Sequence, residues 1–85
     1  MGRKERLLDK ARTSPGNLTF DEICALAESV GFAFRNQAGS HRIYKHPAFG
    51  KIMNFQPDKR DKSKAKRYQI RQLLAFIEES EESDV

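Results

Sequence analysis

Two periodicities alternate along this chain of 85 residues. Apolar residues recur every three or four positions near both ends of the chain and every second position in its middle. The first spacing predicts α-helices and the second predicts β-strands, so the expected order is α-α-β-β-β-α. Short connections between the strands favour an antiparallel meander. The pattern therefore predicts an α+β, two-layer domain in which helices cover one face of a three-stranded antiparallel sheet and the other face stays open.

The first two predicted helices have clear ends. The first covers 3–13 (RKERLLDKART) and stops at SPGN, because proline and glycine destabilise the interior of a helix. The second begins after Thr19, a preferred N-cap residue, and Glu22 three positions later completes a capping box. Gly31 is a natural terminator of this helix.

Three short strands and a last helix follow. The strands are predicted at 32–36, 41–45 and 51–56, and turn residues separate them. The last helix is predicted for 66–79, where apolar residues recur at i, i+3, i+4 and i+7 from Ile70 onward. These elements divide the chain into an N-terminal helix and turn (1–16), a main domain (17–79) and an acidic tail expected to fray (80–85).

The composition is that of a small soluble protein. No apolar run approaches the ~20 residues that a membrane helix needs, and the first residues lack the apolar centre of a signal peptide. The single cysteine, Cys24, lies in an apolar helical pattern and is expected to be a buried thiol. We therefore expect a cytoplasmic protein.

The net charge of +4 conceals a strong asymmetry. Residues 31–76 contain eleven basic side chains against two acidic ones, a net charge of +9, whereas 77–85 contain five acidic side chains and no basic one. A concentrated positive block of this kind favours a polyanionic partner such as RNA or DNA.

His41 is the best catalytic candidate in the sequence. An imidazole titrates near neutral pH, so it can take a proton from a ribose 2′-hydroxyl or give one to a leaving 5′-oxygen. Gly39 allows a close backbone approach, and Ser40 offers a hydroxyl or N–H to phosphate. Strict alternation places His41 on the same face as Ile43, which we expect to point into the core. His41 then lies either just outside the strand or partly buried, and we favour the first because Gly39 loosens the turn. The other histidine, His46, precedes a proline at a turn and is expected to hydrogen-bond locally.

Other chemistries find little support. The chain has no second cysteine or clustered acid–histidine set for zinc, and no glycine-rich phosphate loop. Asp58 and Asp61 are the only central carboxylates, and they lie in a lysine-rich connection, which is a weak pattern for a two-metal nuclease. We expect neither a metal nor a cofactor.

The assembled pattern resembles the HicA toxin family, which comprises small bacterial mRNA interferases of toxin–antitoxin pairs. The resemblance covers residues from about Thr19 to Ile77 and includes VGF at the end of a helix, GSH followed by IY and HP, and KRYQIRQLL in the last helix. Asn54 and Gln56 match an N-x-Q pattern on the third strand of some members. The resemblance implies a double-stranded-RNA-binding-domain-like fold, metal-independent cleavage of mRNA, and inhibition by a HicB-type antitoxin.

The resemblance also assigns roles to residues. The catalytic histidine of the family is the one in GSH, which is His41 here. Many members have a second histidine on the third strand, and MNFQPDK has none. On the hypothesis of a ribonuclease, and apart from the resemblance, the residues that we expect to contact RNA are Gly39, Ser40, Arg42, Lys45, Lys59, Arg60, Lys62, Lys64, Arg67 and Arg71.

Two other functions remain open at this point. A non-catalytic RNA-binding module would use the same basic surface without needing the histidine, and would show steep salt dependence and no cleavage products. A protein-interaction role would use the basic surface to meet an acidic antitoxin.

Overall fold

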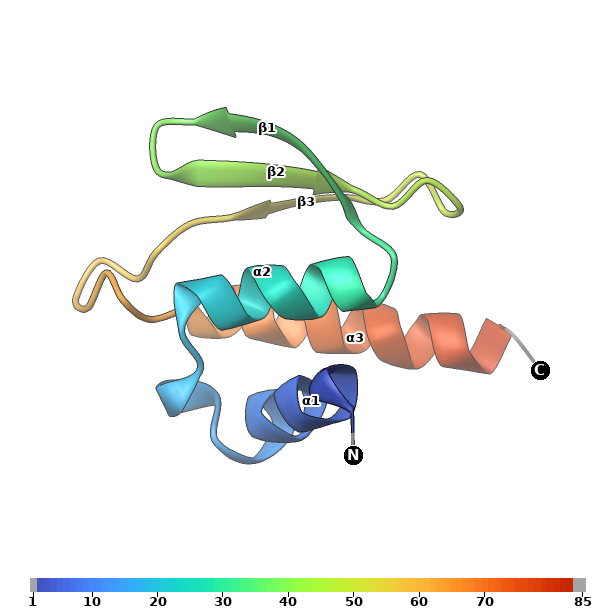
Figure 1. Ribbon diagram of the computed structural model, residues 1–85, viewed down its shortest axis with the longest axis horizontal. Helices are drawn as coiled ribbons and strands as arrows, with labels where there is room; N and C mark the ends of the chain where they lie inside the picture. The colour runs from blue at the N-terminus through green and yellow to red at the C-terminus, as the bar shows by residue number, and fades with distance from the viewer. Residues whose placement is uncertain (1, 84–85) are drawn as a thin grey trace.

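The computed structural model describes the backbone of residues 2–83 and the side chains of residues 2–80. The predicted order of helices and strands is confirmed (Figure 1). The elements are α1 (Arg3–Thr13), a 3-10 turn η1 (Pro15–Asn17), α2 (Phe20–Ser29), β1 (Ala33–Ala38), β2 (His41–Lys45), β3 (Ile52–Phe55) and α3 (Arg67–Ser83).

The three strands form one antiparallel sheet in the order β1-β2-β3. Helices α2 and α3 both lie on one side of the sheet, and no described element covers the other face (Figure 1). Helix α1 packs on α2 and α3 from the side away from the sheet, so it adds a layer beneath the predicted two-layer domain. The predicted α+β class is confirmed.

The core lies between the sheet and the helices. Its largest fully buried side chains come from the segment before α2, from α2, from β3 and from α3. They are Leu18, Ile23, Leu26, Phe55, Ile70, Leu73 and Ile77. Full burial of one such side chain stabilises a fold by roughly 1.5–3 kcal/mol. Leu7 and Ala11 join α1 to this same core, which explains why α1 has an apolar side.

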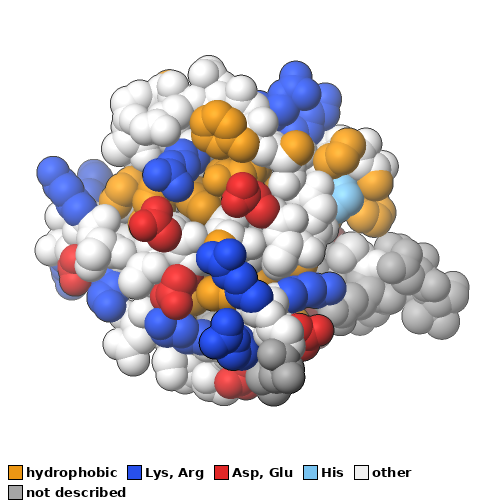
Figure 2. Space-filling model, in the orientation of Figure 1, with side chains coloured by type: hydrophobic (Ala, Val, Ile, Leu, Met, Phe, Trp, Pro, Cys, Tyr) orange, Lys and Arg blue, Asp and Glu red, His pale blue; other side chains and the backbone are white. Residues whose placement is uncertain are grey.

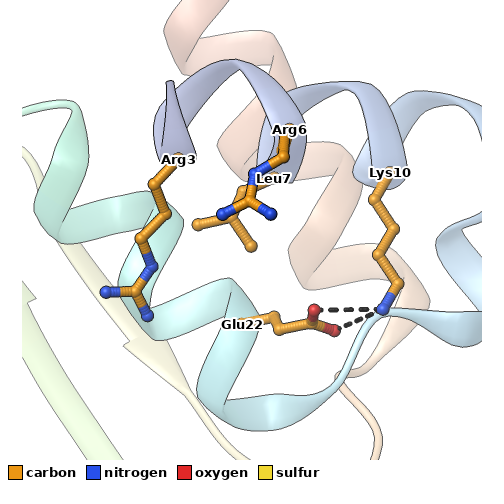
Figure 3. Close-up of a pocket in the computed structure, with 5 residues that line it drawn as sticks. All are labelled: Arg3, Arg6, Leu7, Lys10 and Glu22. Carbon is orange, nitrogen blue, oxygen red and sulfur yellow. Dashed lines mark hydrogen bonds and ion pairs between the residues drawn. The ribbon is translucent and has the colours of Figure 1, made fainter. Parts of the chain in front are cut away.

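The predicted capping box at the start of α2 is confirmed. The Glu22 N–H donates to Thr19 Oγ1 (3.1 Å), and the Thr19 N–H donates to Glu22 Oε1 (3.0 Å). Lys10 of α1 also donates to both oxygens of Glu22, at 2.8 and 3.0 Å. One carboxylate therefore caps α2 and anchors α1 to it (Figure 3).

The prediction that Ile43 points into the core is wrong. Tyr44 is the buried residue of β2, with 3% of its surface exposed, and it pairs with buried Met53 of β3. Adjacent apolar residues leave the inward side of a short strand ambiguous, and here the larger Tyr44 ring turns inward, where it contacts the Phe55 ring and lies near Cys24 of α2. Ile43, and with it His41, faces the open side of the sheet.

The ends of β1 and α3 also differ from the predicted ones. β1 runs from Ala33 to Ala38, past the predicted end at residue 36, and has a register shift between Phe34 and Asn36. Phe34 is about half exposed. Helix α3 continues to Ser83, past the predicted end at residue 79. The last residues of the predicted acidic tail, 84–85, lie outside the described residues. The proposed division into 1–16, 17–79 and 80–85 stays a prediction.

No described helix has the length and apolar character needed to cross a membrane.

Candidate active site

The prediction that His41 lies just outside the strand is wrong: His41 is the first residue of β2, and its side chain is half-buried on the open face of the sheet. It pairs with Ala38 of β1 across a turn of two residues, Gly39 and Ser40. Gly39 has a φ of +61°, which residues other than glycine seldom adopt. Glycine therefore forms this turn without backbone strain. The glycine ahead of the histidine thus shapes the turn from which the imidazole emerges.

Asn54 of β3 is the hydrogen-bond partner of His41. The distance from His41 Nδ1 to Asn54 Oδ1 is 3.2 Å. With the amide oxygen as acceptor, the Nδ1–H donates, and Nε2 carries the lone pair of the neutral ring. The sequence pattern points to Asn54 only as part of N-x-Q. Its hydrogen bond with His41 depends on the pairing of β2 with β3, in which Asn54 lies opposite Ile43.

Gln69 of α3 holds the strand that carries Asn54. Only 4% of Gln69 is exposed. Its Nε2 donates to the Asn54 carbonyl oxygen (2.9 Å), and its Oε1 accepts from the Gln56 N–H (3.1 Å). These two bonds flank Phe55, which points into the core. The polar residues of the third strand and the start of α3 therefore form one bonded unit.

A hollow of about 230 Å³ lies beside His41's neighbour Ser40. Its lining includes three lysines, Lys59 and Lys62 from the connection after β3 and Lys66 from the residue before α3. The structure thus brings three of the sequence-predicted contact residues, Ser40, Lys59 and Lys62, to one place. Lys66 was not among them, although its position in a K-x-K run before the last helix was a visible signal.

Other predicted contact residues lie elsewhere. Arg42 points toward α2, where its guanidinium lies 4.8 Å from the centre of the Phe20 ring and 3.6 Å from Asp21 Oδ1. Lys64 and Arg67 line a separate hollow with Asp61. The remaining three, Lys45 at the far end of β2, Arg60 in the connection and Arg71 on α3, are exposed.

His46 has a structural role. Its Nδ1 accepts from the Ala48 N–H (3.2 Å), which confirms the predicted local hydrogen bond, and its Nε2–H donates to the Val30 carbonyl oxygen at the end of α2 (3.0 Å). The ring is 8% exposed and contacts the rings of three phenylalanines, Phe32, Phe49 and Phe76. Both ring nitrogens are therefore occupied.

Cys24 is buried, as predicted. Burial raises the pKa of its thiol, and burial together with the neighbouring Cys24 raises the pKa of the Tyr44 hydroxyl. Neither group is poised for acid–base chemistry near neutral pH. Among the side chains that the structure describes, no group of three or more His, Cys, Asp and Glu converges as a metal site would require.

Comparison with known families identifies the chain. A family model described as the HicA toxin of bacterial toxin–antitoxin systems matches residues 20–78, which is most of the chain. This protein therefore belongs to the HicA toxin family, the toxin components of two-part systems in which an antitoxin is the partner. Neither the curated proteins nor the solved structures gave a significant match. Helix α1 lies ahead of the matched region.

Proposed function

We propose that this toxin is an endoribonuclease that cleaves mRNA by acid–base catalysis at His41. The observation that carries the proposal is the arrangement on the open face of the sheet. An accessible imidazole is held through Nδ1 by Asn54, and next to it Ser40 lines a hollow with the cations of Lys59, Lys62 and Lys66. A phosphodiester is the substrate class that suits a proton-transfer group beside clustered ammonium groups.

The proposed reaction starts at Nε2 of His41. This nitrogen removes the proton of a ribose 2′-hydroxyl, the 2′-oxygen attacks the adjacent phosphorus, and the bond from phosphorus to the 5′-oxygen breaks. The products are a 2′,3′-cyclic phosphate and a 5′-hydroxyl, whose proton comes from a water molecule or a lysine ammonium group. The lysines of the hollow stabilise the charge that builds on the non-bridging oxygens.

The decisive variant is His41→Ala. It should bind RNA but cleave it roughly 10²–10⁴-fold more slowly than the wild type, because one general acid–base group supplies about that much. The assay uses labelled single-stranded RNA in EDTA, with thermal unfolding of the variant as the control for folding. Cleavage by His41→Ala at the wild-type rate would refute the mechanism.

The same assay separates the main alternative, a non-catalytic RNA-binding module, which the cationic hollow would also serve. RNA that stays intact but migrates more slowly with the wild-type protein would favour this module. Cleavage products in EDTA would exclude it.

We further propose that the antitoxin is of the HicB type and acts in the cytoplasm by covering this cationic face. A partner with complementary negative charge competes with RNA for the same groups. Co-expression of a HicB-like protein from the neighbouring gene should restore growth and co-purify with the toxin. Growth arrest that persists with the bound partner would contradict masking.

A further inference from the structure

The geometry assigns a second functional residue to this site: we infer that Asn54 is a positioning residue that selects the tautomer of His41, and that Gln69 holds Asn54 in place for it. The inference rests on the proposed ribonuclease function where it concerns the rate, and on the structure alone where it concerns the tautomer. It gives a role to the side chain of Asn54 on β3, a strand that contains no histidine in this protein.

The chemical reason lies in the two ring nitrogens. A neutral imidazole has one N–H and one lone pair, and the partner of one nitrogen decides which is which. Asn54 Oδ1, 3.2 Å from His41 Nδ1, keeps the proton on Nδ1. Nε2 is then the basic atom, and it is the nitrogen farther from the backbone. Without Asn54, the proton would distribute between both nitrogens, and a fraction of the molecules would have no base at Nε2.

The bond also restricts the direction of the ring. An exposed histidine rotates about two side-chain bonds, so a single acceptor on the neighbouring strand limits where Nε2 points. Small errors in the placement of a catalytic group are costly in rate. The same exposed bond contributes little to folding, since an exposed hydrogen bond exchanges readily with water. Asn54 is therefore expected to matter for the reaction and not for the fold.

Gln69 extends the unit into the core. β3 is an edge strand of four residues, and such a strand has few ladder bonds to fix it. The amide of Gln69 bonds the Asn54 carbonyl and the Gln56 N–H from the covered side of the sheet. A shift of one residue would move Asn54 to the core side and Phe55 to the open side. Gln69 thus fixes the register that presents Asn54 to His41.

Nitrogen-15 spectra of the histidine rings test the tautomer directly. In the wild type above the pH of imidazole protonation, His41 should be the Nδ1–H form, whereas His46 should be the Nε2–H form because its Nδ1 accepts from Ala48. In Asn54→Ala, His41 should become a mixture of tautomers and His46 should not change. A His41 spectrum that is identical in wild type and Asn54→Ala would overturn the inference, whether or not the protein cleaves RNA.

Kinetics test the consequence for the rate. Asn54→Ala should lower kcat about tenfold or more with little change in KM. Asn54→Asp keeps the acceptor and should restore most of the rate, with the acid limb of the pH–rate profile moved to higher pH, because a carboxylate favours the imidazolium form. The matched control is Asn36→Ala, an exposed asparagine on β1 opposite Ile43, which should change neither rate nor profile.

The outcomes separate the two claims. An inactive His41→Ala beside a fully active Asn54→Ala with an unchanged pH profile would overturn the role of Asn54 and leave the ribonuclease standing. A fully active His41→Ala would overturn the ribonuclease mechanism, and the spectra would still decide the tautomer.

Gln69→Met tests the last link. This variant should melt at a lower temperature than the wild type and, when folded, should show the same tautomer mixture as Asn54→Ala, whereas Asn54→Ala should melt like the wild type. A folded Gln69→Met protein with the wild-type His41 spectrum would show that Gln69 does not position Asn54.

Discussion

The imidazole of His46 occupies the space where a side chain at Gly31 would be. A Cβ built on Gly31 would lie 2.5 Å from His46 Nε2. Gly31 also has a φ of +108°, a conformation that other residues rarely adopt. The glycine that ends α2 is therefore required twice, once by the backbone and once by the histidine that bonds the neighbouring Val30 carbonyl.

The first prediction follows from this contact. Gly31→Ala should lower the free energy of unfolding by about 2 kcal/mol or more, since backbone strain and the displacement of His46 both act. The matched control is Gly50→Ala, which has a φ of +69° and no atom within 4 Å of the added Cβ. It should cost only about 1 kcal/mol, from strain alone. Urea unfolding measures both, and equal losses would contradict the role of His46.

The ion pair between Lys10 and Glu22 predicts a pH-dependent stability. Burial acts to raise the pKa of Glu22, but the hydrogen bonds from Lys10 and Thr19 outweigh it and hold the pKa below its ordinary value of 4.5. A lowered folded-state pKa contributes stability that is present above the unfolded pKa and is lost as the pH falls through the folded one.

Glu22→Gln should therefore be less stable than the wild type by about 1 kcal/mol near neutral pH, and the difference should shrink as the pH falls below 4.5. Unfolding curves at several pH values give the difference. Lys10→Met, which removes the ion pair and leaves the capping box, should show an intermediate loss. A difference that does not vary with pH would contradict the assignment.

The buried thiol predicts slow chemical modification. Because burial raises the pKa of Cys24 and the side chain is 3% exposed, little reactive thiolate is available in the folded protein. A thiol reagent should react at least about 100-fold more slowly with the native protein than with the protein in denaturant, where one thiol per chain should react. Equal rates would show that the helix around Cys24 opens readily.

Two groups of cations predict different effects on RNA binding. Lys59 and Lys62 line the hollow beside Ser40. Arg3 and Arg6 line a pocket of about 270 Å³ between α1 and α2 (Figure 3). Helix α1 lies on the side of α2 and α3 that faces away from the sheet (Figure 1). Basic side chains gather over α1 on the face shown in Figure 2, interspersed with acidic ones. If only the net charge mattered, both pairs of cations would contribute equally to RNA binding. The proposed site predicts that only Lys59 and Lys62 contribute.

The double variant Lys59→Ala/Lys62→Ala should bind RNA more weakly and reduce the salt slope of binding by about 1 to 1.5, as expected for the loss of two phosphate contacts to a single strand. Arg3→Ala/Arg6→Ala removes the same charge and should leave both quantities nearly unchanged. Titrations at several salt concentrations measure the slopes. Similar losses in the two variants would indicate binding by overall charge and not at this face.

Local signals predicted the elements well where they were strong. The capping box at Thr19, the break at SPGN and the period from Ile70 placed the helices, because caps, breakers and periodicity act within a few residues. Prediction failed at Ile43 and Tyr44, where two adjacent apolar residues satisfy either orientation of the strand. The choice depends on what lies beneath the sheet, and a strand's own sequence does not contain that information.

The candidate site divides in the same way. The sequence by itself determined the α+β order, the cationic middle of the chain, and His41 behind a glycine turn, since these depend on composition and short-range pattern. Only the tertiary structure decided that His41 faces the open side and that Asn54 is its hydrogen-bond partner. It also decided that Gln69 bonds the strand that carries Asn54, and that Arg42 points away toward α2. Those relationships join residues on different elements. They exist only once strand register and helix packing have been set by the burial of the core.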